Sequence, residues 1–185
     1  HLLNTKTADR LRIKIQVGEG EAVESALSVW PAVDWFEREA YDMFGILFRG
    51  HPNLRRILTH HQFVGHPLRK DYEADRQQHC TVTLPVHFDN TPGQKGDELD
   101  ERFVPLNVGP SHPAMHGTLR VMVELDGESI ARANCEIGYL HRCFEKMAET
   151  HTYNQVIPYT DRLNYCSAPM NNIGYCKAVE RLLGV

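Results

Sequence analysis

The sequence predicts an α+β fold, in which strands and helices occupy separate stretches of the chain. Apolar and polar residues alternate over residues 9–17, which is the pattern of a half-buried antiparallel strand. A second alternating stretch, residues 119–125, is followed by Asp126 and Gly127 and then by an alternating return stretch, residues 131–137. This arrangement predicts a β-hairpin. Apolar residues at helical spacing elsewhere in the chain supply the α component of the prediction.

Composition excludes several classes of protein. The chain has 185 residues, of which 42% are hydrophobic and 24% charged, as is typical of an ordinary globular protein. Its formal net charge of -4 lacks the basic excess of a nucleic-acid-binding domain, so we expect no nucleic acid among its partners. No uninterrupted apolar run reaches the length of about 18 residues that a membrane-spanning helix needs.

The cysteines do not form a recognisable framework. They are five in number, widely spaced, and without a Cys-x-x-Cys pair, so neither a disulfide scaffold nor a cluster-binding motif is predicted. We expect reduced thiols that behave mostly as small hydrophobic residues, and no iron–sulfur cluster bound by this chain itself. The residues are Cys80, Cys135, Cys143, Cys166 and Cys176.

The first part of the chain is predicted to contain two helices. Val23, Leu27 and Trp30 have helical spacing and predict a short amphipathic helix. A second helix is predicted over residues 32–44, with Gly45 placed to cap its C-terminus. Many of its polar residues are charged, which indicates either a solvated face with ion pairs or a docking face for a larger assembly. These charged residues are Asp34, Glu37, Arg38, Glu39 and Asp42.

The middle of the chain lacks regular periodicity. Proline and glycine interrupt residues 49–72 so often that a long loop is predicted, and its basic residues suggest a strap lying on a partner. Residues 73–102 are polar and weakly acidic, which makes them the best candidate for a linker. Within them, residues 82–88 form the one short stretch with strand character. The basic residues of the loop are Arg55, Arg56, Arg69 and Lys70.

Two imidazoles lie in a loop whose shape the sequence restricts. Residues 106–120 carry His112 and His116 together with two prolines and two glycines, which exclude a continuous helix. A metal site is disfavoured, because the prolines break helical geometry and the loop contains no carboxylate or thiol. From the residues alone, the segment is either a shaped set of hydrogen-bond donors or a surface loop with solvated histidines.

A helix is predicted directly after the hairpin. Leu140, Phe144 and Met147 share one helical face, and His141 and Arg142 lie at the predicted start. The helix dipole opposes a cation at a helix N-terminus, so we expect Arg142 to have a counter-group or a function there.

A final helix is predicted over residues 162–183. Pro158 is expected to break the segment before it, and Asp161 is a candidate N-cap. Within this helix, Pro169 and Gly174 are expected to cause a kink or an interruption.

Several motifs of the chain resemble those of a known protein family. Residues 109–120 read Gly-Pro-Ser-His-Pro-Ala-Met-His-Gly-Thr-Leu-Arg and resemble the D (49 kDa) subunit of NADH:quinone oxidoreductase, respiratory complex I. Upstream, residues 35–45 read Trp-Phe-Glu-Arg-Glu-Ala-Tyr-Asp-Met-Phe-Gly and resemble the C (30 kDa) subunit. Because both signatures occur in one chain in this order, the sequence is similar to the fused C/D subunit of some bacteria. The likeness continues at residues 65–71, 137–142, 145–146, 159–165 and 178–180.

The resemblance implies a chain of two parts. Residues 1–72 would be a C-subunit-like α/β docking domain, truncated at its N-terminal side. Residues 73–102 would be the linker. Residues 103–185 would be a D-subunit-like quinone-site domain, comprising the N-terminal hairpin and first helices of a fold related to the large subunit of nickel-iron hydrogenases and truncated at its C-terminal side.

The resemblance also implies a quinone site. By match to the motifs, His116 and Tyr165 would contact the quinone carbonyls, with His112 and Met115 beside them. Quinone reduction develops negative charge on the carbonyl oxygens and takes up protons, so an imidazole and a phenol are suitable donors. From residue types alone, Tyr165 could equally be a core tyrosine.

A second group of residues would lie near a cluster of a partner subunit. Arg142 matches an arginine close to the terminal 4Fe-4S cluster, and His141 and Arg162 would lie in the same area. An arginine beside a cluster stays charged and would raise its reduction potential. From residue types alone, Arg142 could also be a simple salt-bridge partner.

The sequence departs from the family at informative positions. Cys143 stands where the family usually has glycine, and Met115 replaces a smaller residue, which could narrow the quinone cavity. A nickel-iron enzyme would show Arg-x-Cys-x-x-Cys from Arg162, whereas this chain has Asn164 and Ser167 at the two thiolate positions. Losing two thiolates removes half of the expected nickel ligands, so nickel chemistry is not expected.

The biochemical setting follows from the same resemblance. The chain would belong to a proton-translocating NADH dehydrogenase (quinone), in which quinone accepts electrons from the terminal 4Fe-4S cluster, and the fragment alone would be inactive. The 4Fe-4S clusters, FMN and NAD would be bound by partner subunits, so this chain alone would hold no cofactor and no metal. Its partners would be the cluster-bearing B and I subunits and the membrane arm, with the chain peripheral at the cytoplasmic face of the bacterial inner membrane.

Two alternatives stay open at this point. The chain could be a large-subunit-like component of a membrane-bound hydrogenase or of a ferredoxin- or deazaflavin-linked complex. It could also be a purely structural assembly module.

Overall fold

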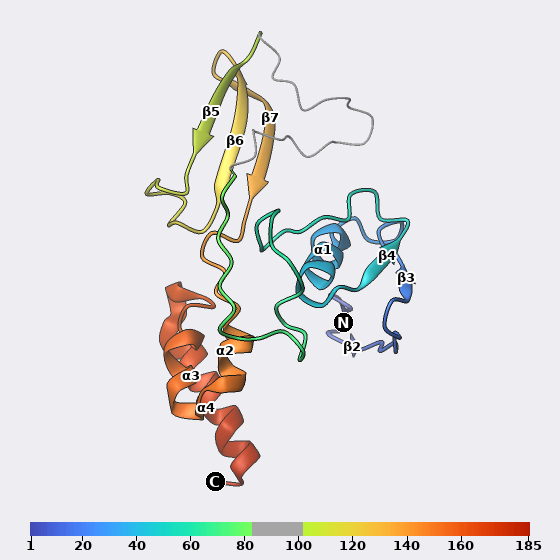
Figure 1. The fold of residues 1–185 in the computed structure, drawn as a ribbon, viewed down its shortest axis with the longest axis vertical. Coiled ribbons are helices and arrows are strands. Elements are labelled where there is room, and N and C mark those ends of the chain that lie inside the picture. The colour runs from blue at the N-terminus through green and yellow to red at the C-terminus, as the bar shows by residue number, and fades with distance from the viewer. Residues whose placement is uncertain (83–101) are drawn as a thin grey trace.

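The computed structural model describes residues 1–82 and 102–185 and confirms a mixed α+β architecture (Figure 1). In these residues β1 (Leu2–Leu3) pairs antiparallel with β2 (Arg10–Leu11), and β3 (Ala22–Glu24) pairs in parallel with β4 (Leu47–Arg49). A larger antiparallel sheet has the order β5 (Val104–Val108), β6 (Arg120–Asp126) and β7 (Ser129–Glu136). The helical elements are α1 (Val33–Phe44), α2 (Phe144–Thr150), α3 (Tyr153–Thr160), the 3-10 helix η1 (Tyr165–Ser167) and α4 (Ala168–Leu183).

The strand predicted over residues 9–17 is mostly wrong. Only β2, at its beginning, is paired, and the apolar side chains of Ile13 and Ile15 are each 64% exposed rather than half-buried. Alternation determines which face a side chain would take, but a strand also needs a neighbouring strand to pair with. Within the described chain, β1 offers such pairing to two residues only.

The helix predicted around residues 23–30 is wrong as well. Its first residues form β3 instead, because β4 supplies a parallel neighbour whose Phe48 is opposite Val23. The chain then turns, and the carboxylate of Glu37 accepts hydrogen bonds from Ser25 Oγ at 2.7 Å and from the Ala26 N–H at 2.8 Å. Tertiary contacts therefore override the helical spacing of the apolar residues.

The helix predicted over residues 32–44 is confirmed as α1, but its solvated charged face is not. Gly45 ends the helix in the left-handed conformation at φ 79°, and its N–H donates to the Tyr41 carbonyl oxygen at 2.8 Å. Three of the charged residues, Glu37, Arg38 and Asp42, are buried, whereas the apolar Phe36 is 68% exposed. The helix turns its charges toward the rest of the chain.

The loop after β4 explains why charged residues of α1 are buried. Arg38 donates from Nε to the Arg55 carbonyl oxygen and from Nη2 to the Arg56 carbonyl oxygen, each at 3.3 Å. Farther along, the Leu68 N–H donates to the Met43 carbonyl oxygen at 3.0 Å. The Arg-rich strap predicted to lie on a partner thus lies on α1 of its own chain.

The predicted hairpin is confirmed as β6 and β7, and the sequence missed β5, which pairs along the other edge of β6. Met122 and Val123 of β6 are buried. Glu124 is 1% exposed and accepts hydrogen bonds from Arg132 Nε at 2.5 Å and Nη2 at 2.8 Å across the sheet. The strand predicted over residues 82–88 lies, apart from its first residue, outside the described residues.

The helices after the hairpin differ from the predictions at their ends. The helix α2 begins at Phe144, so Arg142 precedes it and is not in its first turn. Pro158 lies inside α3 rather than breaking it. Ser167, and not Asp161, is the N-cap of α4, and Pro169 occupies the first turn of α4, where a missing N–H costs nothing and no kink is needed.

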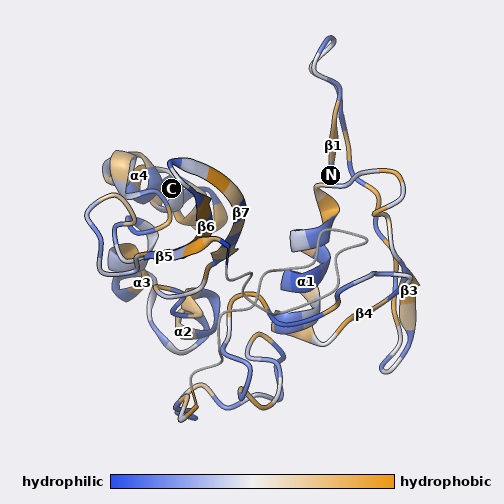
Figure 2. Ribbon diagram, turned by 90° about the horizontal axis from the view of Figure 1, so that it is seen from above, coloured by the Kyte–Doolittle hydropathy of each residue, from blue (hydrophilic) through white to orange (hydrophobic). Residues whose placement is uncertain are grey.

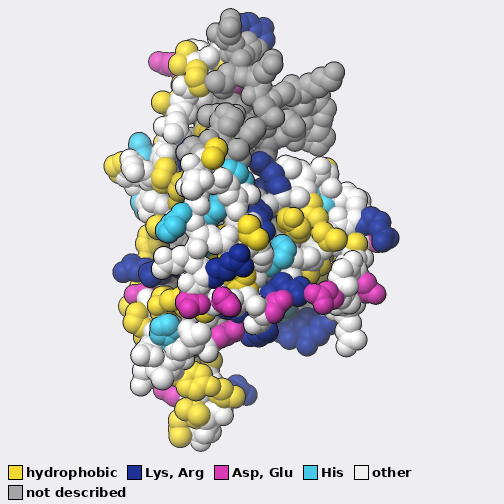
Figure 3. Space-filling model, viewed as in Figure 1, with side chains coloured by type: hydrophobic (Ala, Val, Ile, Leu, Met, Phe, Trp, Pro, Cys, Tyr) yellow, Lys and Arg dark blue, Asp and Glu magenta, His cyan; other side chains and the backbone are white. Residues whose placement is uncertain are grey.

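The two parts of the chain meet along a seam. Figure 2 shows α1, β3 and β4 on one side and the three-stranded sheet with α2, α3 and α4 on the other. Across the seam, Lys146 Nζ donates to the Arg69 carbonyl oxygen at 2.7 Å, and Lys70 forms an ion pair with Glu149. In Figure 3 many hydrophobic side chains are exposed, some of them over α1. None of the described helices is long and apolar enough to span a membrane.

Candidate functional site

The loop between β5 and β6 is closed by a glycine that no other residue can replace without strain. Gly109 has φ 89°, and a Cβ there would lie 2.6 Å from the Leu119 carbonyl oxygen and 2.7 Å from Met115 Cγ. Within the loop, the Met115 N–H donates to the His112 carbonyl oxygen, and the Thr118 N–H to the Met115 carbonyl oxygen, each at 3.0 Å. These turns fix the direction in which residue 116 projects.

His116 projects toward a tyrosine from the other end of this part of the chain. Its backbone is left-handed, with φ 53°, and is followed by Gly117 at φ 78°. The His116 Nδ1 and the Tyr165 hydroxyl form a hydrogen bond between residues 49 positions apart, and the two rings meet edge to face with centroids 5.6 Å apart. Both residues are exposed, Tyr165 by 43%, so a ligand can reach them.

Tyr165 is held in place by the turn between α3 and α4. It is the first residue of η1, and the Ser167 N–H donates to the Asn164 carbonyl oxygen at 3.0 Å. The same carbonyl accepts from Asn171 Nδ2 of α4 at 3.1 Å. Tyr165, which the turn between α3 and α4 holds in place, thus faces the loop between β5 and β6 that carries His116.

The other predicted quinone residues lie in the loop but take different directions. His112 is exposed, and its Nδ1 accepts a hydrogen bond from the Ala114 N–H at 3.1 Å. Met115 is half-buried and packs over Gly109. Of the predicted quinone residues, His116 and Tyr165 are the pair that the structure brings into contact.

The residues predicted to lie near a partner's cluster each have different neighbours. The Arg142 guanidinium lies over the Tyr159 ring, 5.6 Å from its centroid. The side chain of Arg162 is 75% exposed, with Nε 3.9 Å from Asp161 Oδ1. His141 is partly buried, and its Nδ1 lies 3.6 Å from the Cys143 sulfur.

Burial changes the ionisation of the residues beside Arg142. It lowers the pKa of His141, an effect that the carboxylates of Glu145, Asp42 and Glu39 oppose. Burial raises the pKa of the Cys143 thiol to about 11. The histidine is therefore held neutral and the cysteine is held as a thiol, which is a poor metal ligand.

A backbone contact links this segment to the first part of the chain. Gly138, at φ 96°, packs so closely on residue 58 that a Cβ would overlap the Leu58 carbonyl group. Two residues on, the Leu140 side chain covers Gly117, with Cδ1 3.7 Å from where a Cβ would be. Residues 138–142 are thus fitted between the loop of the first part and the histidine loop.

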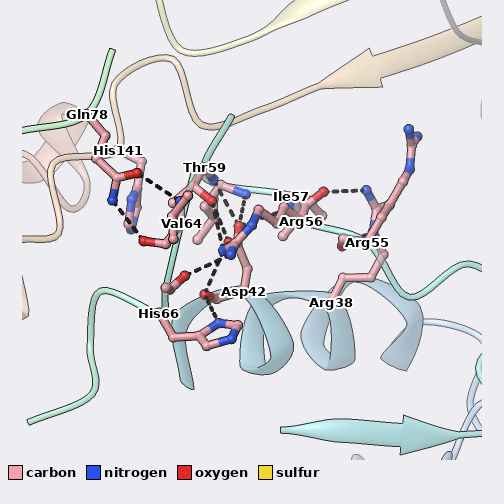
Figure 4. Close-up of polar contacts among 12 residues, drawn as sticks. Arg38, Asp42, Arg55, Arg56, Ile57, Thr59, Val64, His66, Gln78 and His141 are labelled. Atoms are coloured by element: carbon pink, nitrogen blue, oxygen red, sulfur yellow. Dashed lines mark hydrogen bonds and ion pairs between the residues drawn. The ribbon is translucent and has the colours of Figure 1, made fainter. Parts of the chain in front are cut away.

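The loop that carries Leu58 is organised by Asp42, which sequence reasoning missed (Figure 4). One carboxylate oxygen, Oδ2, accepts from the N–H groups of Ile57, Leu58 and Thr59 at 3.0, 2.8 and 2.9 Å. The other, Oδ1, accepts from Arg56 Nη1 at 2.7 Å and Thr59 Oγ1 at 2.5 Å. The signal available in the sequence was the density of charge on a helix followed by an Arg-rich loop.

These contacts decide the charge of the buried carboxyl. Burial alone would raise the pKa of Asp42, but the hydrogen bonds from Thr59, Arg56 and Leu58 outweigh it and lower the pKa. Among the described residues, no group of three or more His, Cys, Asp or Glu side chains could hold a metal ion. Through these hydrogen bonds, Asp42 serves as an anionic anchor for the backbone N–H groups of Ile57, Leu58 and Thr59.

Comparison with known proteins gives a consistent result for the whole chain. Residues 1–78 match the family described as respiratory-chain NADH dehydrogenase, 30 Kd subunit. Over 185 residues the chain is 74% identical to the C/D subunit of NADH-quinone oxidoreductase from Bdellovibrio bacteriovorus. It is 43% identical over 197 residues to the C/D subunit from Acinetobacter baylyi, and 42% identical over 202 residues to that from Psychrobacter cryohalolentis. All of this chain is covered in each case, and it spans 33% of the length of each relative.

Proposed function

The chain belongs to the family of NADH-quinone oxidoreductase C/D subunits, and from this premise we propose that it contributes the quinone headgroup site of the C/D protein. In this proposal residues 1–72 form the docking part, residues 73–102 the linker, and residues 103–185 the beginning of the quinone-site part, related to the large subunit of nickel-iron hydrogenases. The quinone accepts electrons from the terminal 4Fe-4S cluster of a partner subunit.

The observation that carries the proposal is the contact between His116 and Tyr165. Two donors from segments 49 residues apart meet at an accessible surface, although neither is needed there to fill a core. Their mutual hydrogen bond satisfies each group while no ligand is present. A quinone headgroup that separates the two side chains replaces this bond with one from each donor to a carbonyl oxygen.

The chemistry of quinone reduction suits this pair. As electrons arrive, negative charge develops on the carbonyl oxygens, and hydrogen-bond donors placed at those atoms stabilise it. Tyr165 and His116 can then each transfer the donated proton to an oxygen, followed by reprotonation from solvent. His112 and Met115 belong to the same loop. In this proposal, the Met115 side chain narrows the cavity that receives the quinone headgroup.

Arg142 provides the proposed link to the partner's cluster. Arg142 is exposed and its guanidinium lies over the Tyr159 ring, which places a positive charge at the surface. Beside a reduced cluster this charge favours the electron-rich state and raises the reduction potential. His141 and Arg162 would lie at the edge of the same contact. The partners would be the cluster-bearing B and I subunits and the membrane arm, with NADH and FMN bound elsewhere in the complex.

Substituting Tyr165 by Phe in the full-length protein tests the proposal. The variant removes the donor hydroxyl and keeps the ring, so NADH:quinone reductase activity of the assembled complex should fall by about 100-fold, the range of a lost acid–base group. Reduction of ferricyanide by NADH, which needs no quinone site, should stay unchanged.

Tyr153→Phe is the matched control, because Tyr153 is 52% exposed at the start of α3 and is not one of the proposed quinone residues. It should leave quinone reduction unaltered. Normal quinone turnover in an assembled Tyr165→Phe complex would refute the role of this hydroxyl.

A further inference from the structure

A hollow of about 430 Å³ lies beside α1, where that helix meets the loop after β4 and the residue that follows β7, and neither His116 nor Tyr165 is among its described lining residues. Two aromatic side chains of α1 line it, Trp35 and Phe36, which are 45% and 68% exposed. Figure 3 shows hydrophobic side chains gathered over α1 on the same view as Figure 1. The remaining apolar lining comes from Pro31 and Ala32 before α1, Ile57 and Leu58 of the loop, and Ile137 beyond β7.

The hollow also has a charge of one sign. Asp34 and Glu39 are the only charged side chains among its described lining residues, and Glu39 is exposed. The side chain of Asp34 is 40% exposed, and its nearest ionisable neighbour is His51, with Nε2 3.1 Å from Oδ1. Two nearby cations, Arg38 and Arg56, are turned to backbone carbonyls and to Asp42, and no Lys or Arg is among the described lining residues.

Apolar walls with acidic edges specify the chemistry of what binds. Trp35 offers a ring face to a cation, Phe36 offers a surface for an aliphatic stem, and Glu39 offers a counter-charge at the rim. A lysine or arginine flanked by aliphatic residues satisfies all three. A purely apolar segment would leave the carboxylates facing a desolvated surface, which is unfavourable.

We propose that this hollow is the docking site for a segment of another subunit of the oxidoreductase complex, a segment that presents a Lys or Arg between aliphatic side chains. This inference rests on the proposed function only in that the chain works within a multi-subunit complex. It does not depend on the quinone site. The lining crosses the seam, since Ile137 belongs to the second part and the other residues to the first, so an occupant would hold the two parts together.

A photo-crosslinking residue identifies the occupant directly. Benzoylphenylalanine is placed at position 36 of the full-length protein, the assembled complex is irradiated, and the crosslinked peptide is mapped by mass spectrometry. The expected product is a peptide of a different subunit with a Lys or Arg among aliphatic residues. The control carries the same amino acid at position 130, where Ile130 of β7 is 64% exposed and does not line the hollow. Crosslinks within the same chain, to lipid or detergent, or to a segment without a cation would each overturn the proposal.

Charge reversal provides the second test. Glu39→Lys should reduce the crosslink yield from position 36 by about tenfold or more, because a like charge then faces the incoming cation. Reversing the mapped cation to Glu in the partner should restore the yield. Glu128→Lys, at an exposed turn, is the matched control and should have no effect. An unchanged yield in Glu39→Lys, or no rescue, would refute the charge match.

The two proposals fail in different ways. If the complex assembles and Tyr165→Phe turns over quinone normally, the quinone site is refuted while the crosslink at position 36 persists. If Tyr165→Phe is inactive but position 36 gives no crosslink to another subunit, the docking site alone is refuted.

Discussion

At the scale of single residues, the most consequential side chain outside the contact between His116 and Tyr165 is Asp42. Its carboxylate is fully buried and accepts hydrogen bonds from three consecutive N–H groups, a hydroxyl and a guanidinium. Such an anion is stabilised only while all its donors remain, because a buried charge without partners is costly. The loop conformation at Ile57, Leu58 and Thr59 therefore depends on the charge of one residue.

Replacing Asp42 with Asn should open this loop. The amide offers one acceptor oxygen and places an NH₂ group against donors, so local stability should fall by roughly 3 kcal/mol. Amide hydrogen exchange of Ile57, Leu58 and Thr59 measures the change. Asp75→Asn, at an exposed position, is the control and should leave their protection intact. Unchanged protection in Asp42→Asn would contradict the anchoring role.

The same residue predicts a pH dependence. Because the pKa of Asp42 is lowered in the folded chain, its stabilising contribution is fully present above the unfolded value of about 3.9 and is lost as pH falls through the folded pKa. Protection of the three amides should decrease in that acidic range. The decrease should be absent from Asp42→Asn, whose side chain does not titrate.

Candidate site residues could be proposed from the sequence only where a motif carried them. The motifs selected His116 and Tyr165, which the structure brings into contact, whereas residue types alone left Tyr165 as a possible core residue. Asp42 stands within a matching motif too, but neither helical period nor charge count tells whether an acid on a helix faces water or a loop. Whether Asp42 faces water or protein depends on the conformation of residues 50–72, and this loop has no helical or strand periodicity from which its path could be predicted.

At the scale of elements, the helices differ in how much their glycines matter. Gly45 ends α1 at a positive φ, and a Cβ there would lie 2.7 Å from His66 Cδ2. Gly174 lies inside α4, and a Cβ there would meet nothing within 4 Å among the described residues. Gly45 is required by the backbone conformation at the end of α1, whereas Gly174 lowers the stability of α4.

Two alanine substitutions should therefore have opposite effects. Gly45→Ala should destabilise the end of α1 by about 1–2 kcal/mol, because the residue is forced into a left-handed conformation beside His66. Gly174→Ala should stabilise α4 by about 1 kcal/mol through helix propensity. Hydrogen exchange of each helix, measured in the full-length protein, tests both. Equal effects of the same sign would show that the local conformations do not decide stability.

Elements were predictable where local signals agreed with the tertiary contacts. The hairpin has alternation and a turn at Asp126 and Gly127, and α1 has an apolar period and a glycine cap, so both were predicted correctly. The segment at residues 23–30 has helical spacing, but its first residues pair with β4, where Val23 is opposite Phe48, a residue 25 positions later in the chain. A pairing partner of that kind is not visible within a local window.

At the scale of the whole molecule, a small number of polar contacts join the two parts. Lys146 is 6% exposed in α2, and its ammonium group is bound to the Arg69 carbonyl oxygen of the first part. Glu149 Oε2 lies 3.6 Å from the same ammonium and compensates its charge. The sequence predicted two parts, but the contacts between them could not be predicted, because no pattern in either part alone indicates which residues of the other part it will touch.

Substituting Lys146 by Met should loosen this seam. The variant keeps the side-chain volume but leaves the Arg69 carbonyl without its charged donor, at a cost of about 2 kcal/mol. Exchange protection should fall in α2 and near Arg69, with β6 unaffected. Lys177→Met, on the exposed face of α4, should change neither. Loss of protection throughout the chain would instead indicate general unfolding.

The approach of Gly138 to Leu58 has a consequence for the order of folding. Ribosomes deliver a chain from its N-terminus, so the segment around Leu58 emerges before Gly138 has been made. We therefore expect the earlier segment, once anchored by Asp42, to provide the surface on which residues 138–142 pack as they are synthesised. Two separate chains would have to meet by diffusion before these surfaces could pack. In one fused polypeptide the two surfaces are synthesised in a fixed order and already connected.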